Sequence, residues 1–342
     1  MAVMTYREAV RLAIIEEMDR DSNVFVMGED IGRYKGTFRV TDGLYEKYGI
    51  EKEDWLVPST NSRRDGIARR VIDTPITEPA IVGMATGAAM TGLRPIVEMM
   101  TMIFSIWALD QLINHAAKIH YMTGGKAKVP LVVRGPGGAA NQLSAQHSHS
   151  IEGWYAHVPG LKVVAPSFAS DAKGMLKTAI RDDNPVIFTE NPGVYGLKED
   201  VTEDVDFTVP FGKAKVVKEG KDLSLIGYSR MTHVNLKAAE LLEKDGLDVE
   251  VVDVRSLLPL DTETIYASVR KTHRAVVVYE DWRSGGFGAE IAARIGEDCF
   301  DDLDAPVGRV GGLNVPMPYA RVLELQCIPN ENDVLDAVRK IG

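Results

Sequence analysis

The sequence has few cysteines and no long apolar segment. Among its 342 residues only Cys299 and Cys327 are cysteines, and no Cys-x-x-Cys pair occurs. Two separated thiols are too few for a disulfide framework and lack the spacing of a zinc site. No apolar run reaches about 18 residues, the length that indicates a membrane helix. The first 20 residues mix acidic and basic side chains, unlike a signal peptide. We therefore expect a protein of the reducing cytoplasm, with no membrane contact.

Positive charge is not concentrated in any segment either. The chain carries 49 acidic and 39 basic side chains, for a formal net charge of -10, and the basic residues are scattered. A nucleic-acid-binding domain usually has a basic patch or stripe. Nucleic acid is therefore not an expected partner.

Residues 70–92 predict a strand, a turn and a helix. A short apolar run at 71–72 ends at a proline-marked turn, and Pro79 suits the first turn of the small-residue helix that follows. Glu78 would then stand at a strand-to-helix corner, and open α/β sheets bind ligands at such corners. The alternative is that Glu78 only caps the helix, where an acidic side chain favours the helix dipole.

The rest of the chain alternates apolar strand-like and amphipathic helix-like segments, in two series. Such alternation is typical of parallel sheets. An acidic, apolar-poor segment at 198–206 separates the series and suits a linker. We expect an α/β protein with domains at 1–200 and 216–342, joined by a linker at 201–215. The expected strands are 23–30, 95–98, 129–134, 162–165, 185–189, 223–227, 249–254, 275–279 and 307–310, and the expected helices are 105–121, 169–181, 236–244, 262–270, 288–300 and 334–341.

The glycine-rich segment at 135–138 partly matches a dinucleotide-binding fingerprint. The residues that follow it, Ala139 to Gln142, do not begin an apolar helix. Without that helix the pyrophosphate would lack the dipole that holds it. We therefore do not expect nicotinamide binding here.

Several motifs occur in order along nearly the whole chain: DTPITE at 73–78, GLRPIVE at 92–98, RGPGG at 134–138, QHS at 146–148, PGLKVVAPS at 159–167, AIRDDNP at 179–185 and PMPYA at 316–320. Together they resemble the beta subunit of thiamine-diphosphate-dependent 2-oxo acid dehydrogenases. The resemblance implies two three-layer α/β domains, a transketolase-like pyrimidine-binding domain followed by a transketolase C-terminal domain. The RGPGG and QHS segments look like the pyruvate type. Acetoin or a branched-chain 2-oxo acid stays open as substrate, and so does a non-catalytic assembly role.

The resemblance also implies roles for three side chains. Glu78 matches the carboxylate that hydrogen-bonds a pyrimidine nitrogen of thiamine diphosphate, and Phe104 matches an aromatic that stacks on the pyrimidine. His147 fits the histidine that handles protons when the acyl group passes to a lipoyl arm. From the residue types alone, Phe104 could equally be a core residue and His147 a hydrogen-bonded loop residue. His149 is assigned no role.

A potassium site is implied at the end of the helix expected at 169–181. The AIRDDNP segment looks like the potassium loop of the family, in which oxygens surround a hard cation. A helix end followed by a turn before Pro185 is the simpler alternative. The implied ligands are Leu131, Ala179, Ile180, Asp182 and Asn184.

One motif of the family is missing. No Gly-Asp-Gly followed by an Asn-Asn pair occurs, although the family binds the diphosphate and Mg²⁺ through that pattern. It belongs to the alpha subunit, so the resemblance implies an α2β2 heterotetramer with a shared thiamine diphosphate. The other implied partners are the 2-oxo acid substrate and the lipoyl domain and core of a dihydrolipoyl acyltransferase.

The sequence departs from the family between Gly49 and Arg70. Relatives usually connect these positions with a few residues, whereas residues 50–69 intervene here. Long structureless loops are uncommon in compact domains. We therefore expect Trp55 to pack on protein and Arg63 and Arg64 to face solvent, with a floppy insertion as the alternative.

Overall fold

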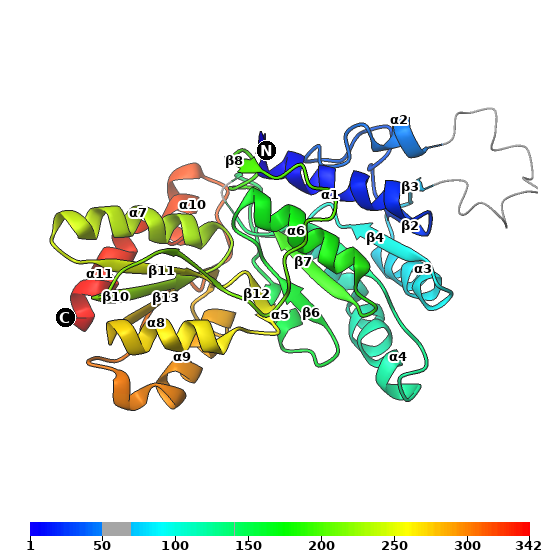
Figure 1. Cartoon of the computed structure of the whole chain (residues 1–342). Coiled ribbons are helices and arrows are strands. Elements are labelled where there is room, and N and C mark those ends of the chain that lie inside the picture. The colour runs from blue at the N-terminus through cyan, green and yellow to red at the C-terminus, as the bar shows by residue number, and fades with distance from the viewer. Residues whose placement is uncertain (50–69, 140) are drawn as a thin grey trace, which may run out of the picture.

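The computed structural model describes residues 1–49, 70–139 and 141–342, and these form two α/β domains side by side (Figure 1). The first domain is built on a seven-stranded sheet of order β12-β6-β7-β5-β4-β2-β3. Its elements are β1 (Ala2–Thr5), α1 (Tyr6–Arg20), β2 (Val24–Gly28), α2 (Leu44–Tyr48), β3 (Val71–Asp73), α3 (Glu78–Met90), β4 (Arg94–Glu98), the 3-10 helix η2 (Met102–Ala108), the π-helix η3 (Gln111–Ala116), α4 (Ala117–Met122), β5 (Val132–Pro136), α5 (Glu152–Ala156), β6 (Lys162–Val164), α6 (Ala169–Arg181), β7 (Val186–Glu190) and β8 (Lys198–Val201).

The second domain is built on a five-stranded sheet of order β14-β13-β10-β11-β9. Helices cover both faces, with α7 and α11 on one side and α8 and α9 on the other (Figure 1). Its elements are β9 (Lys215–Lys218), β10 (Leu223–Gly227), α7 (Arg230–Lys244), β11 (Val249–Asp253), β12 (Ser256–Leu258), α8 (Thr262–Thr272), β13 (Ala275–Trp282), α9 (Phe287–Asp298), the 3-10 helix η4 (Phe300–Asp302), β14 (Gly308–Gly312), α10 (Arg321–Cys327) and α11 (Glu331–Ile341).

The first sheet is parallel except at one edge. Strands β2, β5 and β7 are buried along their whole length, and β4 is buried except at Arg94, as expected for Val- and Ile-rich strands with helices on both faces. Helices α1 and α6 pack together on one face, while α3, η2 and η3 lie on the other. The expected fold class, two three-layer α/β domains, is confirmed.

The two domains share a sheet edge. Strand β12 comes from the second half of the chain but pairs antiparallel with β6 of the first sheet, with Ser256 opposite Val164. The backbone N–H of Ala165 also donates to the carbonyl of Arg255 at 2.8 Å. One cluster of buried apolar side chains continues from the first domain into the second. The domains are therefore joined by backbone pairing as well as by packing.

Two segments differ in detail from what the sequence predicts. The segment 105–121 is helical, as expected, but it is not one regular helix, because η2, η3 and α4 follow one another with different hydrogen-bond spacings. The proposed linker at 198–206 begins with β8, which pairs antiparallel with β1. Its acidic side chains suit an exposed edge strand as well as a linker.

Both cysteines are free and buried, and among the described residues no helix is long and apolar enough to cross a membrane.

Candidate active site

Glu78 stands at the corner between β3 and α3. It is the first residue of α3, and Pro79 follows it in the first turn, where a missing N–H costs nothing. The side chain is buried, with 6% of its surface exposed, and its Oε2 has no hydrogen-bond partner among the described residues. A buried carboxylate oxygen without a hydrogen bond destabilises the fold unless a ligand donates one to it. Glu78 therefore has the surroundings of a ligand-binding group rather than of a simple helix cap.

A second buried carboxylate, Glu29, lies beside Glu78. It follows β2, and the parallel pairing of Gly28 with Asp73 brings the ends of β2 and β3 together. Burial, and next the negative charge of Glu78, raise the pKa of Glu29. The Oε1 of Glu29 also lacks a partner among the described residues. The sequence placed Glu29 at a strand end, but its proximity to Glu78 depends on the pairing of two distant strands.

Phe104 and His147 are brought into contact. Their ring centroids are 5.1 Å apart and the ring planes are 78° apart, an edge-to-face arrangement. Phe104 lies on η2, half-buried against the core, and η2 packs against α3, the helix that begins with Glu78. All three predicted site residues thus belong to one region of the first domain.

His149 contacts the second domain instead. Its ring lies edge-to-face against Trp282 of β13, with centroids 5.0 Å apart. The sequence assigned no role to His149, and no sequence signal indicated this pairing. The loop that carries His147 is therefore in contact with both domains.

A buried arginine fixes the strands beneath the site. Arg134 of β5 contacts the carboxylates of Glu98 and Glu190, which end β4 and β7. Its Nη2 donates to Glu190 Oε2 at 2.8 Å, and the Tyr195 hydroxyl donates to the same oxygen at 2.8 Å. Breaking such a buried, hydrogen-bonded pair leaves an uncompensated charge, at a cost of about 3–5 kcal/mol. The arginine of the RGPGG motif therefore has a structural function in this fold.

The oxygens of the implied potassium site lie at the C-terminal end of α6 and at Leu131, immediately before β5. Carbonyl and carboxylate oxygens at the negative end of a helix dipole are the donors that a hard cation prefers. The Leu131 carbonyl accepts from Val186 N at 2.8 Å, and the Ala179 carbonyl accepts from Asp182 N at 3.3 Å. Asn184 donates from its backbone and its side chain to Asp182 Oδ1, at 2.9 and 3.0 Å.

Two cationic side chains already contact these oxygens. Arg94 Nη1 donates to the carbonyls of Ile180 and Asp182, at 3.0 Å each, and Lys162 pairs with the Asp182 carboxylate. A potassium ion would therefore share the oxygens with two positive charges. Among the described residues, no group of three or more His, Cys, Asp or Glu side chains could hold a metal ion.

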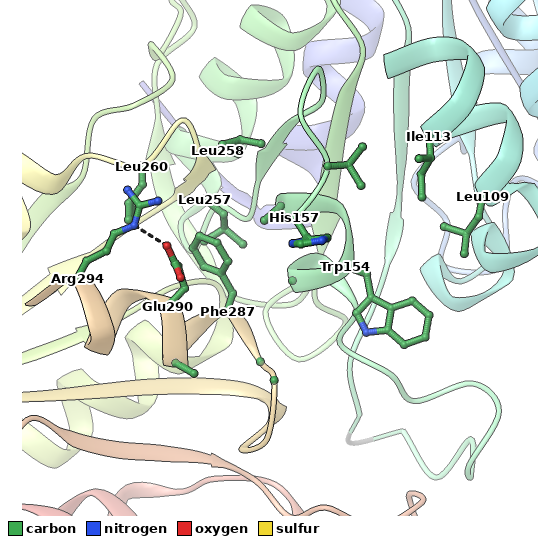
Figure 2. A pocket seen from close by; sticks show the side chains of 16 residues that line it. Leu109, Ile113, Trp154, His157, Leu257, Leu258, Leu260, Phe287, Glu290 and Arg294 are labelled. Carbon is green, nitrogen blue, oxygen red and sulfur yellow. Dashed lines mark hydrogen bonds and ion pairs between the residues drawn. The ribbon is translucent and has the colours of Figure 1, made fainter. Parts of the chain in front are cut away.

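A large groove lies elsewhere in the described part of the chain. It has a volume of about 850 Å³ and lies between α5 and η3 of the first domain and α9 of the second (Figure 2). The Glu290–Arg294 ion pair, at 2.7 Å, borders it, and Glu78, Phe104 and His147 are not among its lining residues. Its lining is Leu109, Ile113, Gly153, Trp154, Ala156, His157, Val158, Leu257, Leu258, Leu260, Gly285, Gly286, Phe287, Ala289, Glu290 and Arg294.

The residues that could bind thiamine diphosphate fit the pyrimidine half of the cofactor. The Oε2 of Glu78, which has no partner within the described part of the chain, is an acceptor for a ring N–H, and the half-buried Phe104 offers an aromatic surface. The predictions for Trp55, Arg63 and Arg64 concern positions outside the described residues.

Comparison with known proteins is consistent with this geometry. The transketolase pyrimidine-binding domain family matches residues 2–198, and the transketolase C-terminal domain family matches residues 212–334. A solved structure described as a split-gene transketolase, an inactive beta4 tetramer, superposes with a TM-score of 0.76 at 24% identity, and the alignment covers 99% of this chain and 98% of that one. At that identity the similarity concerns the fold.

Curated relatives are much closer in sequence. The pyruvate dehydrogenase E1 component subunit beta of Rickettsia felis is 49% identical over 99% of this chain and 98% of its own length. The mitochondrial subunit of the same name from Drosophila melanogaster is 49% identical over 99% of this chain and 89% of its own length. The chain therefore belongs to the family of pyruvate dehydrogenase E1 component beta subunits, with a transketolase pyrimidine-binding domain followed by a transketolase C-terminal domain.

Proposed function

We propose that the chain is the beta subunit of the decarboxylating component of a pyruvate dehydrogenase complex. This component decarboxylates pyruvate oxidatively with thiamine diphosphate and transfers the acetyl group to the lipoyl group of an acyltransferase. The observation that carries the proposal is the buried carboxylate of Glu78 at the strand-to-helix corner, whose Oε2 has no hydrogen-bond partner among the residues that the structure describes. The relatives that match nearly the whole chain bear the pyruvate dehydrogenase name, which favours pyruvate over acetoin or a branched-chain 2-oxo acid.

Each site residue has one task in this proposal. Thiamine diphosphate, when bound, supplies the electron sink that decarboxylation needs. Glu78 hydrogen-bonds a nitrogen of the pyrimidine through Oε2 and shares its proton, and Phe104 packs against the pyrimidine. His147, held against Phe104, moves protons during acyl transfer to the lipoyl arm. The presence of these side chains together argues against a purely structural assembly subunit.

The chain would provide half of the site. It lacks the Gly-Asp-Gly and Asn-Asn pattern, so an alpha subunit would hold the diphosphate and Mg²⁺ in an α2β2 heterotetramer. The lipoyl domain and the core of a dihydrolipoyl acyltransferase would be the further partners. A cytoplasmic location belongs to the proposal, in keeping with two free cysteines.

Two finer assignments are also proposed. A potassium ion would bind at the end of α6, supported by the oxygen-rich surroundings of Asp182. The domains would be 1–200 and 216–342 with a linker at 201–215, close to the residues that the two family matches cover.

The substrate assignment is tested with the purified heteromer. Pyruvate, acetoin and a branched-chain 2-oxo acid are compared by kcat/KM in the same acceptor-coupled assay. We expect pyruvate to exceed both others by at least about tenfold, equivalent to about 1.4 kcal/mol in transition-state binding. A higher kcat/KM for either alternative would replace pyruvate as the substrate.

A further inference from the structure

We propose that Glu280 and Glu324 of the second domain are positioning residues for the loop of the first domain that connects β5 to α5 and carries His147. Both carboxylates accept hydrogen bonds from the backbone of that loop, across the domain boundary. The effect on catalysis rests on the proposed function of His147, whereas the effect on the loop does not.

Glu280 holds the start of the loop. It lies in β13, its side chain is 8% exposed, and its Oε1 accepts from the backbone N–H of Ala139 at 2.7 Å. Its Oε2 accepts from the Nδ2 of Asn191, the residue immediately after β7, at 2.9 Å. Arg230 lies 3.8 Å from the same carboxylate and offsets part of the cost of burying its charge. The carboxylate thus joins two segments of the first domain to the second domain.

The backbone at Gly138 is shaped to accept this contact. Gly138 has φ +86°, and a Cβ atom there would collide with Glu280 Oε1. Glycine adopts this conformation without steric cost. The last glycine of the RGPGG motif therefore allows a carboxylate from the other domain to reach the backbone, a use that the nucleotide-binding interpretation of the motif did not include.

Glu324 holds the loop a few residues further on. It lies on α10, is fully buried, and accepts from the backbone N–H of Gln142 through Oε1 at 2.8 Å. Gln142 has φ +54°, a left-handed backbone conformation that residues other than glycine seldom adopt. Such a conformation persists only where the surroundings impose it. The buried carboxylate is one such constraint.

The far end of the loop is fixed by two further contacts. The backbone N–H of Gly138 donates to the carbonyl of His149 at 2.8 Å, which closes the loop on itself. The ring of His149 packs edge-to-face on Trp282, two residues beyond Glu280 on β13. His147 therefore lies between anchored segments, and its ring is placed against Phe104.

The carboxylates act on the backbone, so their effect does not depend on the side chains of the loop. Hydrogen bonds from a backbone N–H to an ionised carboxylate are shorter and stronger than neutral ones. Removing the acceptor would leave a partly buried N–H without this partner. The loop would then open locally more often, while the two sheets remain intact.

The test compares Glu280→Ala, Glu324→Ala and the double variant, all of which remove the acceptor, with Glu297→Ala, which removes an exposed carboxylate on α9. Backbone hydrogen exchange of Ala139 and Gln142 is followed in the full heteromer. We expect exchange to be about tenfold faster or more in the two site variants and unchanged in the control. Exchange at the wild-type rate in the double variant would overturn the proposal.

Two rates measured on the same variants distinguish a displaced His147 loop from a general loss of activity. Acetyl transfer to a lipoyl domain is compared with decarboxylation coupled to an artificial acceptor. Because His147 serves acyl transfer, we expect the rate of acetyl transfer in the site variants to fall at least about fivefold more than the rate of decarboxylation. Faster exchange with equal losses in both assays would support the positioning of the loop and contradict the proposed function of His147.

The wild-type protein provides a test that needs no variant. If Glu280 and Glu324 hold the loop, the amides of Ala139 and Gln142 are protected from exchange in the unmodified heteromer. Exchange of both amides at the rate of an open chain would overturn the proposal even if the variants failed to fold.

Discussion

The imidazole of His147 stands edge-on to the ring of Phe104, with 5.1 Å between the ring centroids. This contact joins a loop residue to η2, which in turn packs against α3 and its first residue, Glu78. The packing thereby brings together, from three parts of the chain, one residue for each function in the proposal: proton sharing, stacking and proton transfer.

The first prediction concerns the chain by itself. Because it lacks the motif that binds the diphosphate and Mg²⁺, the isolated subunit is expected to be inactive with pyruvate and an artificial electron acceptor. Adding an alpha-type subunit should restore turnover. Turnover by the isolated chain would show that the site is complete without a partner.

The second prediction is that His147→Ala impairs acetyl transfer to a lipoyl domain more than decarboxylation measured with an artificial acceptor. A general acid or base contributes about a hundredfold or more to the step it serves. His120→Ala, which removes an exposed histidine of α4, is the matched control and should leave both rates unchanged. Equal losses in both assays would contradict the proposed function of His147.

The position of Glu78 could be predicted from the sequence because it is encoded locally. The apolar run, the turn and Pro79 lie within ten residues of one another and mark the strand-to-helix corner. Helix α6 and strand β10 were likewise predicted with their observed bounds, because α6 has a clear helical period and β10 is a short, mostly apolar run. Local patterns of this kind can be read without knowing the tertiary structure.

The contacts between distant segments could not be predicted in this way. Strand β12 is three residues long and forms only by pairing with β6, and β9 likewise needs β11 as its partner. The proximity of Glu29 to Glu78 follows from the pairing of β2 with β3. Glu324 lies on α10, which the sequence analysis did not predict, and it reaches the loop across the domain boundary.

The third prediction concerns pH and the domain boundary. Glu152 of α5 and Asp281 of β13 are buried close together, near Glu280 and Tyr228. Burial, and next the charge of Asp281, raise the pKa of Glu152 to about 8, and burial raises the pKa of Asp281 to about 7. The native state then keeps protons that the unfolded chain has released, because unfolded carboxyls titrate near 4.

The free energy of unfolding should therefore fall as pH rises from about 5 to 8. The slope is at most about 1.4 kcal/mol per pH unit for each proton retained. In Glu152→Gln the fall should be smaller, and the variant should be more stable than the wild type at pH 8. Denaturant unfolding at a series of pH values measures this, and equal slopes in both proteins would refute the proton linkage.

The fourth prediction tests the potassium site. An ion that binds only the folded state raises the melting temperature with its concentration. The wild type should melt at a higher temperature in potassium than in an equal concentration of choline, and Asp182→Ala should lose the difference. Asp183→Ala, which removes the neighbouring carboxylate that pairs with Lys128 and Arg94, should keep it. Identical melting of the wild type in both salts would exclude the ion.

The central claim is that the buried carboxylate of Glu78 shares a proton with the pyrimidine of thiamine diphosphate. Glu78→Gln keeps the shape of the side chain but cannot share that proton. Removing one such interaction costs on the order of 3 kcal/mol, or about a hundredfold in rate. The most direct measurement is the exchange rate of the thiazolium proton in the assembled heteromer. The account predicts that Glu78→Gln slows this exchange about a hundredfold or more, and exchange at the wild-type rate would contradict it.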